Sequence, residues 1–239
     1  MTIFALSSGP GLSGIAVIRI SGGECKKIIS SLTEGPFPKK RLATLKKIIN
    51  NKTNEIIDEG IVLWFPAPNS YTGEDMVEFH VHGSKAVIHE LHNVILSFEG
   101  CRLAEPGEFT KLAFQNNKIN LLKAESIGDL IASETELQRK QALRIMSGDS
   151  SNKFNKWREG LIKILAEYEA KIDFPDEDLT TNISREIKFE SEKIADEISH
   201  TLEDNKTGEI IREGFKIAII GPPNVGKSSL LNYLSKRDA

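Results

Sequence analysis

Apolar and polar positions in the first hundred residues predict a mixed α/β domain. Residues 76–81 alternate most cleanly, so that three apolar side chains face one way while Glu78 and His80 face the other. Residues 15–20 form a β-branched run bounded by glycines, which is typical of a strand. The expected elements are strands over residues 15–20, 61–65 and 76–81 and helices over residues 24–32 and 84–98.

From Pro106 onward the apolar residues follow the period of long helices. Pro106 suits the first turn of a helix, and Ser133 with Glu136 forms a capping-box pattern for a helix that ends near Gly148. The further expected elements are a helix over 154–172, a break at 173–178, a charged helix over 184–204 and a hinge at 206–209. The chain therefore changes from a mixed α/β region to a helical one.

A third kind of segment follows the hinge. Residues 215–220 are almost continuously apolar, which is typical of a parallel strand covered on both faces. The sequence GPPNVGKS comes next, at residues 221–228, and residues 229–235 are expected to be helical. This is the complete G-x-x-x-x-G-K-S pattern in the strand, loop and helix context of a phosphate-binding P-loop.

The chemistry of phosphate binding explains this spacing. Glycines let backbone N–H groups curl around phosphates, Lys227 can reach the β- and γ-phosphates, and the Ser228 hydroxyl can ligate Mg²⁺. A glycine-rich turn without a ligand is disfavoured by this context. The residues that position water and read the base follow the P-loop in such folds, and the sequence ends at Ala239. We therefore expect a fragment of a longer protein that hydrolyses no nucleotide by itself.

Charge and composition narrow the functional classes. The 239 residues include 31 basic and 34 acidic ones, for a formal net charge of −3, which argues against a protein that coats nucleic acid but allows a local RNA-binding patch. Cys25 and Cys101 are far apart and lack metal-ligand spacing, so we read them as thiols in a reducing cytoplasm. Neither a signal peptide nor a membrane-spanning stretch is recognisable, which favours a cytoplasmic protein.

Two charged residues allow two interpretations each, and a third has one default interpretation. Arg19 and Glu78 stand within apolar strand patterns, so each either points into solvent or orients a polar ligand in a cleft. Lys118 is by default a cation near the end of a helix. Residue chemistry alone leaves both interpretations open.

Two other patterns are weaker. Residues 9–14 read G-x-G-x-x-G, but a dinucleotide site needs a strand before the glycines and a helix after them, and here a strand follows. His80 and His82 share a strand face, and His89 and His92 share a helix face. A metal site there is conceivable, but ordinary surface histidines are preferred because no carboxylate or cysteine set has convincing spacing.

Taken together, the motifs make the chain resemble the MnmE (TrmE) family of tRNA modification GTPases. The resemblance covers essentially all 239 residues. The stretches that carry it are IAVIRISG (15–22), PNSYTGED (68–75), HG (82–83), PGEFT (106–110), AE with DLI (124–125 and 129–131), IDFPDE (172–177) and GPPNVGKS (221–228).

The resemblance implies three parts. Residues 1–115 are expected to form an α/β domain that dimerises and binds 5-formyl-tetrahydrofolate as a one-carbon donor. Residues 116–211 are expected to be the first portion of an all-α domain of long helices. Residues 212–239 would then be the incomplete beginning of a Ras-like P-loop α/β GTPase domain, after which the chains of full-length family members return to the helical domain.

Site residues follow from the same resemblance. Arg19, Glu78 and Lys118 fall on positions that contact the folate in the family, where a carboxylate and two cations suit a pterin edge and a glutamate tail. Ser228 is the expected magnesium ligand, and Asn224 is expected to help hold the K⁺ that offsets transition-state charge. The implied GTP-binding residues are Asn224, Val225, Gly226, Lys227, Ser228 and Ser229.

The implied function is that of a GTPase in tRNA modification. It would work with the flavoprotein MnmG to install a carboxymethylaminomethyl group on the wobble uridine, and GTP hydrolysis would drive a conformational change. One alternative is a folate-binding one-carbon enzyme of the aminomethyltransferase type, with the nucleotide domain as regulator. A second alternative is a non-enzymatic dimerisation scaffold.

Overall fold

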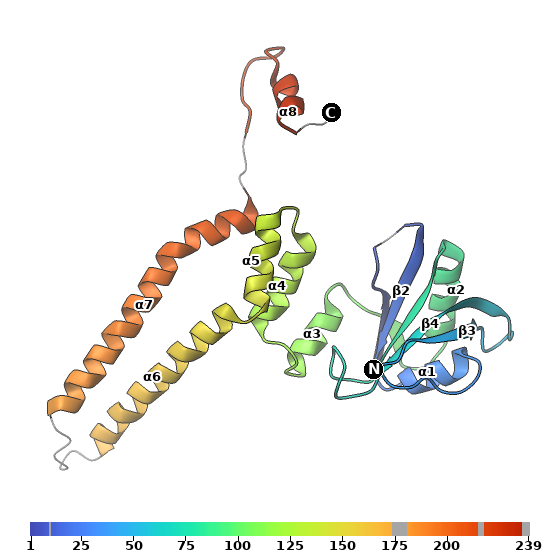
Figure 1. The fold of residues 1–239 in the computed structure, drawn as a ribbon, viewed down its shortest axis with the longest axis horizontal. Helices are drawn as coiled ribbons and strands as arrows, with labels where there is room; N and C mark the ends of the chain where they lie inside the picture. The colour runs from blue at the N-terminus through green and yellow to red at the C-terminus, as the bar shows by residue number, and fades with distance from the viewer. Residues whose placement is uncertain (10, 174–180, 215–217, 236–239) are drawn as a thin grey trace. The chain divides into compact units, whose positions relative to one another are not determined.

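A computed structural model describes residues 1–9, 11–173, 181–214 and 218–235 (Figure 1). The chain divides into two compact units, Met1–Ala124 and Glu125–Ala239. The first unit is built on a sheet and the second on long helices, as the change of pattern near Pro106 predicts.

The first unit contains a six-stranded sheet with the order β3-β4-β5-β2-β1-β6. Neighbouring strands are antiparallel, except that β1 and β6 run parallel. The strands are β1 (Thr2–Leu6), β2 (Ser13–Ser21), β3 (Thr44–Ile49), β4 (Ile56–Phe65), β5 (Met76–Gly83) and β6 (Cys101–Leu103). The three strands expected from the sequence are β2, β4 and β5.

Two helices, α1 (Cys25–Leu32) and α2 (Lys85–Leu96), pack on the sheet (Figure 1). The alternation in β5 has the predicted consequence, because Val77, Phe79 and Val81 are all buried in the core. The neighbouring strand β2 contributes its own alternate residues to this core, including Ile18 and Ile20. Burial of these apolar side chains is the main stabilising term of the unit.

Polar residues take the alternate positions of the same two strands. Arg19, Glu78 and His80 are each partly exposed. Exposed apolar side chains also occur at alternate positions of the sheet, among them Ile15, which is 66% exposed, and Leu45, which is 65% exposed. The alternate residues of these strands therefore fall into two sets. One set is buried in the core, and the other is at least partly exposed and can contact a ligand.

Strands β1, β3 and β6 were not predicted. The pattern of β3 is hidden because Lys46, a charged residue, takes an inward position and is only 7% exposed. Its ammonium donates to the backbone oxygen of Glu34 at 2.9 Å and to that of Pro36, so that the buried charge is solvated by carbonyl groups. Strand β6 has only three residues, too few for an alternation to be recognised.

The helix near Pro106 begins later than predicted. Helix α3 runs from Glu108 to Gln115, and Pro106 precedes it instead of lying in its first turn. The cause is Gly107, which caps the helix with a φ of +77°, a conformation that glycine adopts without steric cost.

Helices α4 (Leu121–Ala132) and α5 (Glu136–Met146) follow. The capping box lies two residues beyond the predicted one, because Thr135 and Gln138, not Ser133 and Glu136, exchange the capping hydrogen bonds. The hydroxyl of Ser133 instead donates to the Leu130 oxygen at 2.7 Å and so closes the preceding helix.

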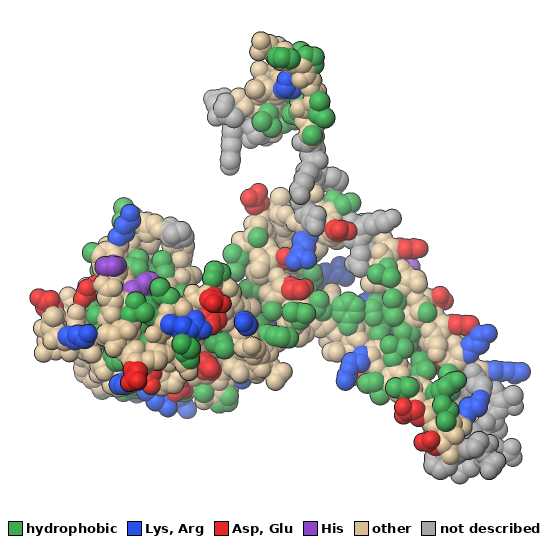
Figure 2. All heavy atoms as spheres, turned by 180° about the vertical axis from the view of Figure 1, so that it is seen from behind, with side chains coloured by type: hydrophobic (Ala, Val, Ile, Leu, Met, Phe, Trp, Pro, Cys, Tyr) green, Lys and Arg blue, Asp and Glu red, His purple; other side chains and the backbone are tan. Residues whose placement is uncertain are grey.

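The second unit is dominated by α6 (Asp149–Asp173) and α7 (Thr181–Glu213), which pack side by side and antiparallel (Figure 1). Trp157 donates from its indole nitrogen to Glu197 at 2.9 Å, and one turn along, a Cβ on Gly160 would lie 2.8 Å from Ile194. Gly160 therefore permits the close approach of the two helices. Figure 2 shows hydrophobic side chains gathered along this pair, where Leu161, Ile162 and Leu165 are exposed.

The predicted hinge at residues 206–209 is wrong, because α7 is continuous through it. A glycine in a helix costs about 1 kcal/mol relative to alanine. Packing offsets this cost, since Gln141 of α5 donates from its side-chain amide to the Gly208 oxygen at 3.0 Å. The predicted break at 173–178 lies almost wholly outside the described residues.

The apolar segment 215–220 is not a strand where it is described. Residues 218–220 lack strand pairing, and residues 215–217 lie outside the described part. A strand is defined by hydrogen bonds to a neighbouring strand. No described strand pairs with residues 218–220. Helix α8 (Lys227–Ser235) begins two residues earlier than expected. None of the described helices is both long and apolar enough to span a membrane.

The close contact of β4 and β5 at Gly60 gives a stability test. A Cβ on Gly60 would lie 2.3 Å from the backbone oxygen of His80, so Gly60→Ala must push the two strands apart. We expect a loss of about 2 kcal/mol or more in the free energy of unfolding, measured by urea denaturation. The matched control is Gly14→Ala, because a Cβ on Gly14 meets no atom within 4 Å. Equal stability of the two variants would contradict the packing described here.

Candidate functional site

The loop between residues 221 and 226 has the geometry of a phosphate cradle. Asn224 has a φ of +62° and Gly226 a φ of +89°, and these left-handed residues turn the chain sharply into α8. Lys227 is the first residue of that helix. Its ammonium reaches back over the loop to the backbone oxygens of Gly221 at 3.0 Å and Pro222 at 2.6 Å.

This arrangement suits an anion. The free N–H groups at the start of α8 and the ammonium of Lys227 provide positive charge at one place. The predicted nucleotide-binding residues, 224 to 229, are consecutive and comprise the end of the loop and the first turn of α8. Among the described residues, no group of three or more His, Cys, Asp or Glu side chains could hold a metal ion.

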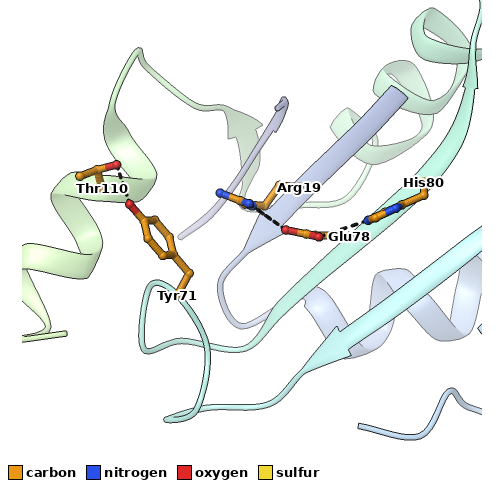
Figure 3. A network of polar contacts seen from close by, with 5 residues as sticks. All are labelled: Arg19, Tyr71, Glu78, His80 and Thr110. Atoms are coloured by element: carbon orange, nitrogen blue, oxygen red, sulfur yellow. Dashed lines mark hydrogen bonds and ion pairs between the residues drawn. The ribbon is translucent and has the colours of Figure 1, made fainter. Parts of the chain in front are cut away.

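A second polar cluster lies in the first unit (Figure 3). Strand register pairs Arg19 of β2 directly with Glu78 of β5. Arg19 donates from two nitrogens to one carboxylate oxygen of Glu78, each at 2.9 Å. The other oxygen of Glu78 lies 3.2 Å from Nε2 of His80. The structure therefore brings together two of the three residues that the sequence suggested for a polar ligand.

Two aromatic rings complete the surroundings of Arg19. Its guanidinium carbon lies 5.5 Å from the ring centre of Tyr71 and 5.6 Å from that of Phe109. Both distances are within the range of a cation–π contact. The Tyr71 hydroxyl shares a hydrogen bond of 2.9 Å with that of Thr110, which links the loop before β5 to helix α3 (Figure 3).

A buried hydrogen-bond network holds the loop that carries Tyr71. The hydroxyls of Ser21 and Thr72 share a hydrogen bond of 2.7 Å, and Ser21 also contacts the Glu74 carboxylate at 2.9 Å. Asn116 donates from its side chain to the Thr72 oxygen at 2.7 Å. Thr72 and Ser21 are fully buried, so the loop has a fixed conformation against β2.

Lys118 lies at the same loop. A Cβ on Gly73 would be 2.9 Å from Cε of Lys118, so the lysine stem passes directly over that glycine. The backbone N–H of Lys118 donates to the Ala113 oxygen at 2.8 Å, just beyond the end of α3. Lys118 therefore follows the end of α3, and its side chain passes Gly73, two residues after Tyr71 on the loop.

An ion pair anchors α3 next to the cluster. Arg102 of β6 donates to both carboxylate oxygens of Glu108, at 2.8 Å from Nη1 and by a second bond from Nη2. These bonds from Arg102, together with the N–H of Glu105, lower the pKa of Glu108 to about 2. Glu108 directly precedes Phe109, so the ion pair fixes the residue that contacts Arg19.

The histidines take part in local pairs. His82 lies 2.8 Å from Asp58 through its ring Nδ1, and its backbone N–H also donates to Asp58 at 2.7 Å. Burial works to raise the pKa of Asp58, but the hydrogen bonds from His82 and Glu59 outweigh it and hold that pKa below its ordinary value. His92 packs edge-on against Phe4 in the core.

Sequence reasoning missed the roles of Tyr71, Phe109, Thr110 and His80. Tyr71 and Phe109 lie in the stretches 68–75 and 106–110, which stood out only as motifs. Neither stretch has a pattern that shows which side chain turns toward β2. That information arises only when loop and helix meet across a sequence separation of nearly forty residues.

The fold, the phosphate loop and the polar cluster around Arg19 define the chain as a P-loop protein with several parts. An α/β domain that carries the polar cluster comes first, and a helical region and the phosphate loop follow it. Comparison with known families agrees. The family described as GTP-binding protein TrmE N-terminus matches residues 2–118, and the one described as MnmE helical domain matches residues 121–238. The chain belongs to the MnmE (TrmE) family.

Curated relatives give the same result. The chain is 64% identical over 238 residues to the tRNA modification GTPase MnmE of Pelagibacter ubique, covering 100% of this chain and 54% of the relative. It is 49% identical over 237 residues to the protein of that name from Rickettsia typhi, covering 99% of this chain and 53% of the relative. The chain thus spans about half the length of these relatives.

The Arg102–Glu108 pair predicts a dependence of stability on pH. The pKa of Glu108 in the folded chain, about 2, is below its ordinary 4.5, so the pair stabilises fully above pH 4.5 and loses this effect as pH falls toward 2. We expect Glu108→Gln to be less stable than wild type above about pH 5 and equally stable near pH 2. Urea unfolding at several pH values measures this, with Glu99→Gln as an exposed control. A constant difference across the range would contradict the assignment.

Proposed function

We propose that this chain is the folate-binding and phosphate-binding portion of a GTPase that modifies tRNA. The observation that carries the proposal is the complete phosphate loop, with Lys227 folded over it, in a chain whose relatives are named tRNA modification GTPases. The names of the relatives favour this function over an aminomethyltransferase or a scaffold. The proposal includes three parts of the chain: an α/β folate-binding domain over residues 1–115, a helical portion over 116–211 and the beginning of a GTPase domain over 212–239.

The nucleotide site would use the residues of the loop and the first turn of α8. Lys227 would hold the β- and γ-phosphates, with backbone N–H groups of Val225, Gly226 and Ser229 around them. Ser228 offers a hydroxyl oxygen to Mg²⁺, and Asn224, in its left-handed conformation, offers an amide oxygen to K⁺. Bound Mg²⁺ would neutralise phosphate charge. The 239 residues contain no Asn-Lys-x-Asp sequence to read guanine.

The folate site would be the cluster around Arg19 and Glu78. A pterin presents adjacent N–H donors and a carbonyl on one edge, and a carboxylate beside a guanidinium is the complementary pair. Glu78 is 13% exposed and already accepts hydrogen bonds, so its carboxylate is held ready to accept others. Lys118, whose side chain passes Gly73 of the loop that carries Tyr71, would attract the carboxylates of a glutamate tail.

Partners follow from the same proposal. The whole protein would act on tRNA in the cytoplasm together with the flavoprotein MnmG. It would form a homodimer through the first unit, where the exposed apolar residues Leu12, Ile15 and Leu45 offer surface for a second copy. GTP hydrolysis would drive a conformational change and not the chemistry on the base.

The folate site can be tested on this chain. Glu78→Gln and Arg19→Ala should each weaken binding of 5-formyl-tetrahydrofolate by about tenfold or more, because each removes a charged hydrogen-bond partner. Isothermal titration calorimetry measures the dissociation constants, with Lys52→Ala as a control at an exposed lysine of a distant turn. Wild-type affinity in both variants would place the folate elsewhere.

The nucleotide proposal is tested by Lys227→Ala in the complete gene product. We expect the modified wobble uridine to disappear from tRNA hydrolysates examined by mass spectrometry, because the phosphates lose their main cation. Lys188→Ala, at an exposed lysine of α7, serves as the control. Continued modification by the Lys227 variant would refute a mechanism that depends on GTP.

A further inference from the structure

The two rings beside Arg19 do not belong to the buried core cluster of the first unit. Both contact the same guanidinium, although Tyr71 comes from the loop before β5 and Phe109 from α3. Each ring is only partly buried, whereas the aromatic side chains of the core, such as Phe4 and Phe79, are fully enclosed. Partly exposed aromatic surface beside a charged pair can contact a flat ligand.

We propose that Tyr71 and Phe109 form the stacking surface for the planar ring of the ligand held by Arg19 and Glu78. This inference rests on the proposed folate site and adds two binding residues to it. Aromatic faces attract flat groups, whether a guanidinium or a heteroaromatic ring. Glu78 and Arg19 bind the edge of such a ring in its plane, and Tyr71 and Phe109 contact its face.

The surroundings hold both rings in place. The hydroxyl bond between Tyr71 and Thr110 fixes the Tyr71 ring at its far end, and Thr110 adjoins Phe109 on α3. Arg102 anchors the first turn of that helix through Glu108. Because both rings are fixed before a ligand binds, stacking requires little further loss of conformational freedom.

This surface selects for one part of the ligand. The glutamate tail of a folate presents carboxylates, which gain little from an aromatic face and suit Lys118. The pterin has a flat pyrimidine half with donors and a carbonyl on its edge, so it matches both the polar pair and the rings. A charged but non-aromatic anion would gain nothing from Tyr71 or Phe109.

The test compares variants that remove a ring with variants that keep it. Tyr71→Leu and Phe109→Leu should each weaken binding of 5-formyl-tetrahydrofolate by about tenfold in calorimetry. Phe109→Tyr should stay within about threefold of wild type because the ring is kept. Phe37→Leu, at an exposed aromatic residue against Trp64, is the control for ring loss elsewhere. The absorbance of the bound pterin adds a second readout, since stacking lowers its intensity in wild type and less so in the leucine variants.

The outcomes separate the two proposals. If wild type binds no 5-formyl-tetrahydrofolate, the folate site itself fails. If wild type binds and the leucine variants bind equally well, the site stands and the stacking surface is refuted. If Phe109→Tyr weakens binding as much as Phe109→Leu, ring stacking is also refuted. Should Phe109→Leu fail to fold by circular dichroism, Tyr71→Leu and the absorbance of the bound pterin decide the question.

Discussion

The register between β2 and β5 is the constraint on which the first unit depends. It pairs Ile18 with Phe79 in the core and, one position along, Arg19 with Glu78 among the partly exposed residues. Successive side chains of a strand point to opposite faces, so a slip of one residue would bury the ion pair and expose the core. Core and polar cluster are therefore set by the same hydrogen-bond ladder. Apolar burial is what prevents the slip, and the position of the charged pair follows from it.

Local patterns allowed much of this to be predicted. The alternation in residues 76–81 placed Glu78 opposite the core residues, and the structure confirms it. The loop at 221–228 is also a local feature, since its glycines, Asn224 and Lys227 determine its path within a few residues. In the first case the cause is the pleat of a strand, and in the second it is the geometry of a turn. Both causes act within a single short segment of the chain.

Long-range interactions account for what could not be predicted. The hinge at 206–209 is helical because α5 supports Gly208, and β3 exists although Lys46 breaks its pattern. Residues 218–220 show the opposite case, since they are apolar and pair with no described strand. Tyr71 and Phe109 approach Arg19 only after the loop and α3 have packed. Each of these four cases depends on residues outside the segment itself.

The two sites differ in how the fold supports them. The phosphate loop needs only its own turn and the start of α8, whereas the Arg19 cluster draws on β2, β5, α3 and the intervening loop. A site assembled from so many elements is rigid and specific in shape, which suits a ligand with a flat ring and a defined edge. The most direct test is a crystal structure of the chain with 5-formyl-tetrahydrofolate. We predict the pterin edge against Glu78 and its ring against Tyr71 and Phe109; a pterin bound away from Glu78 would contradict the account.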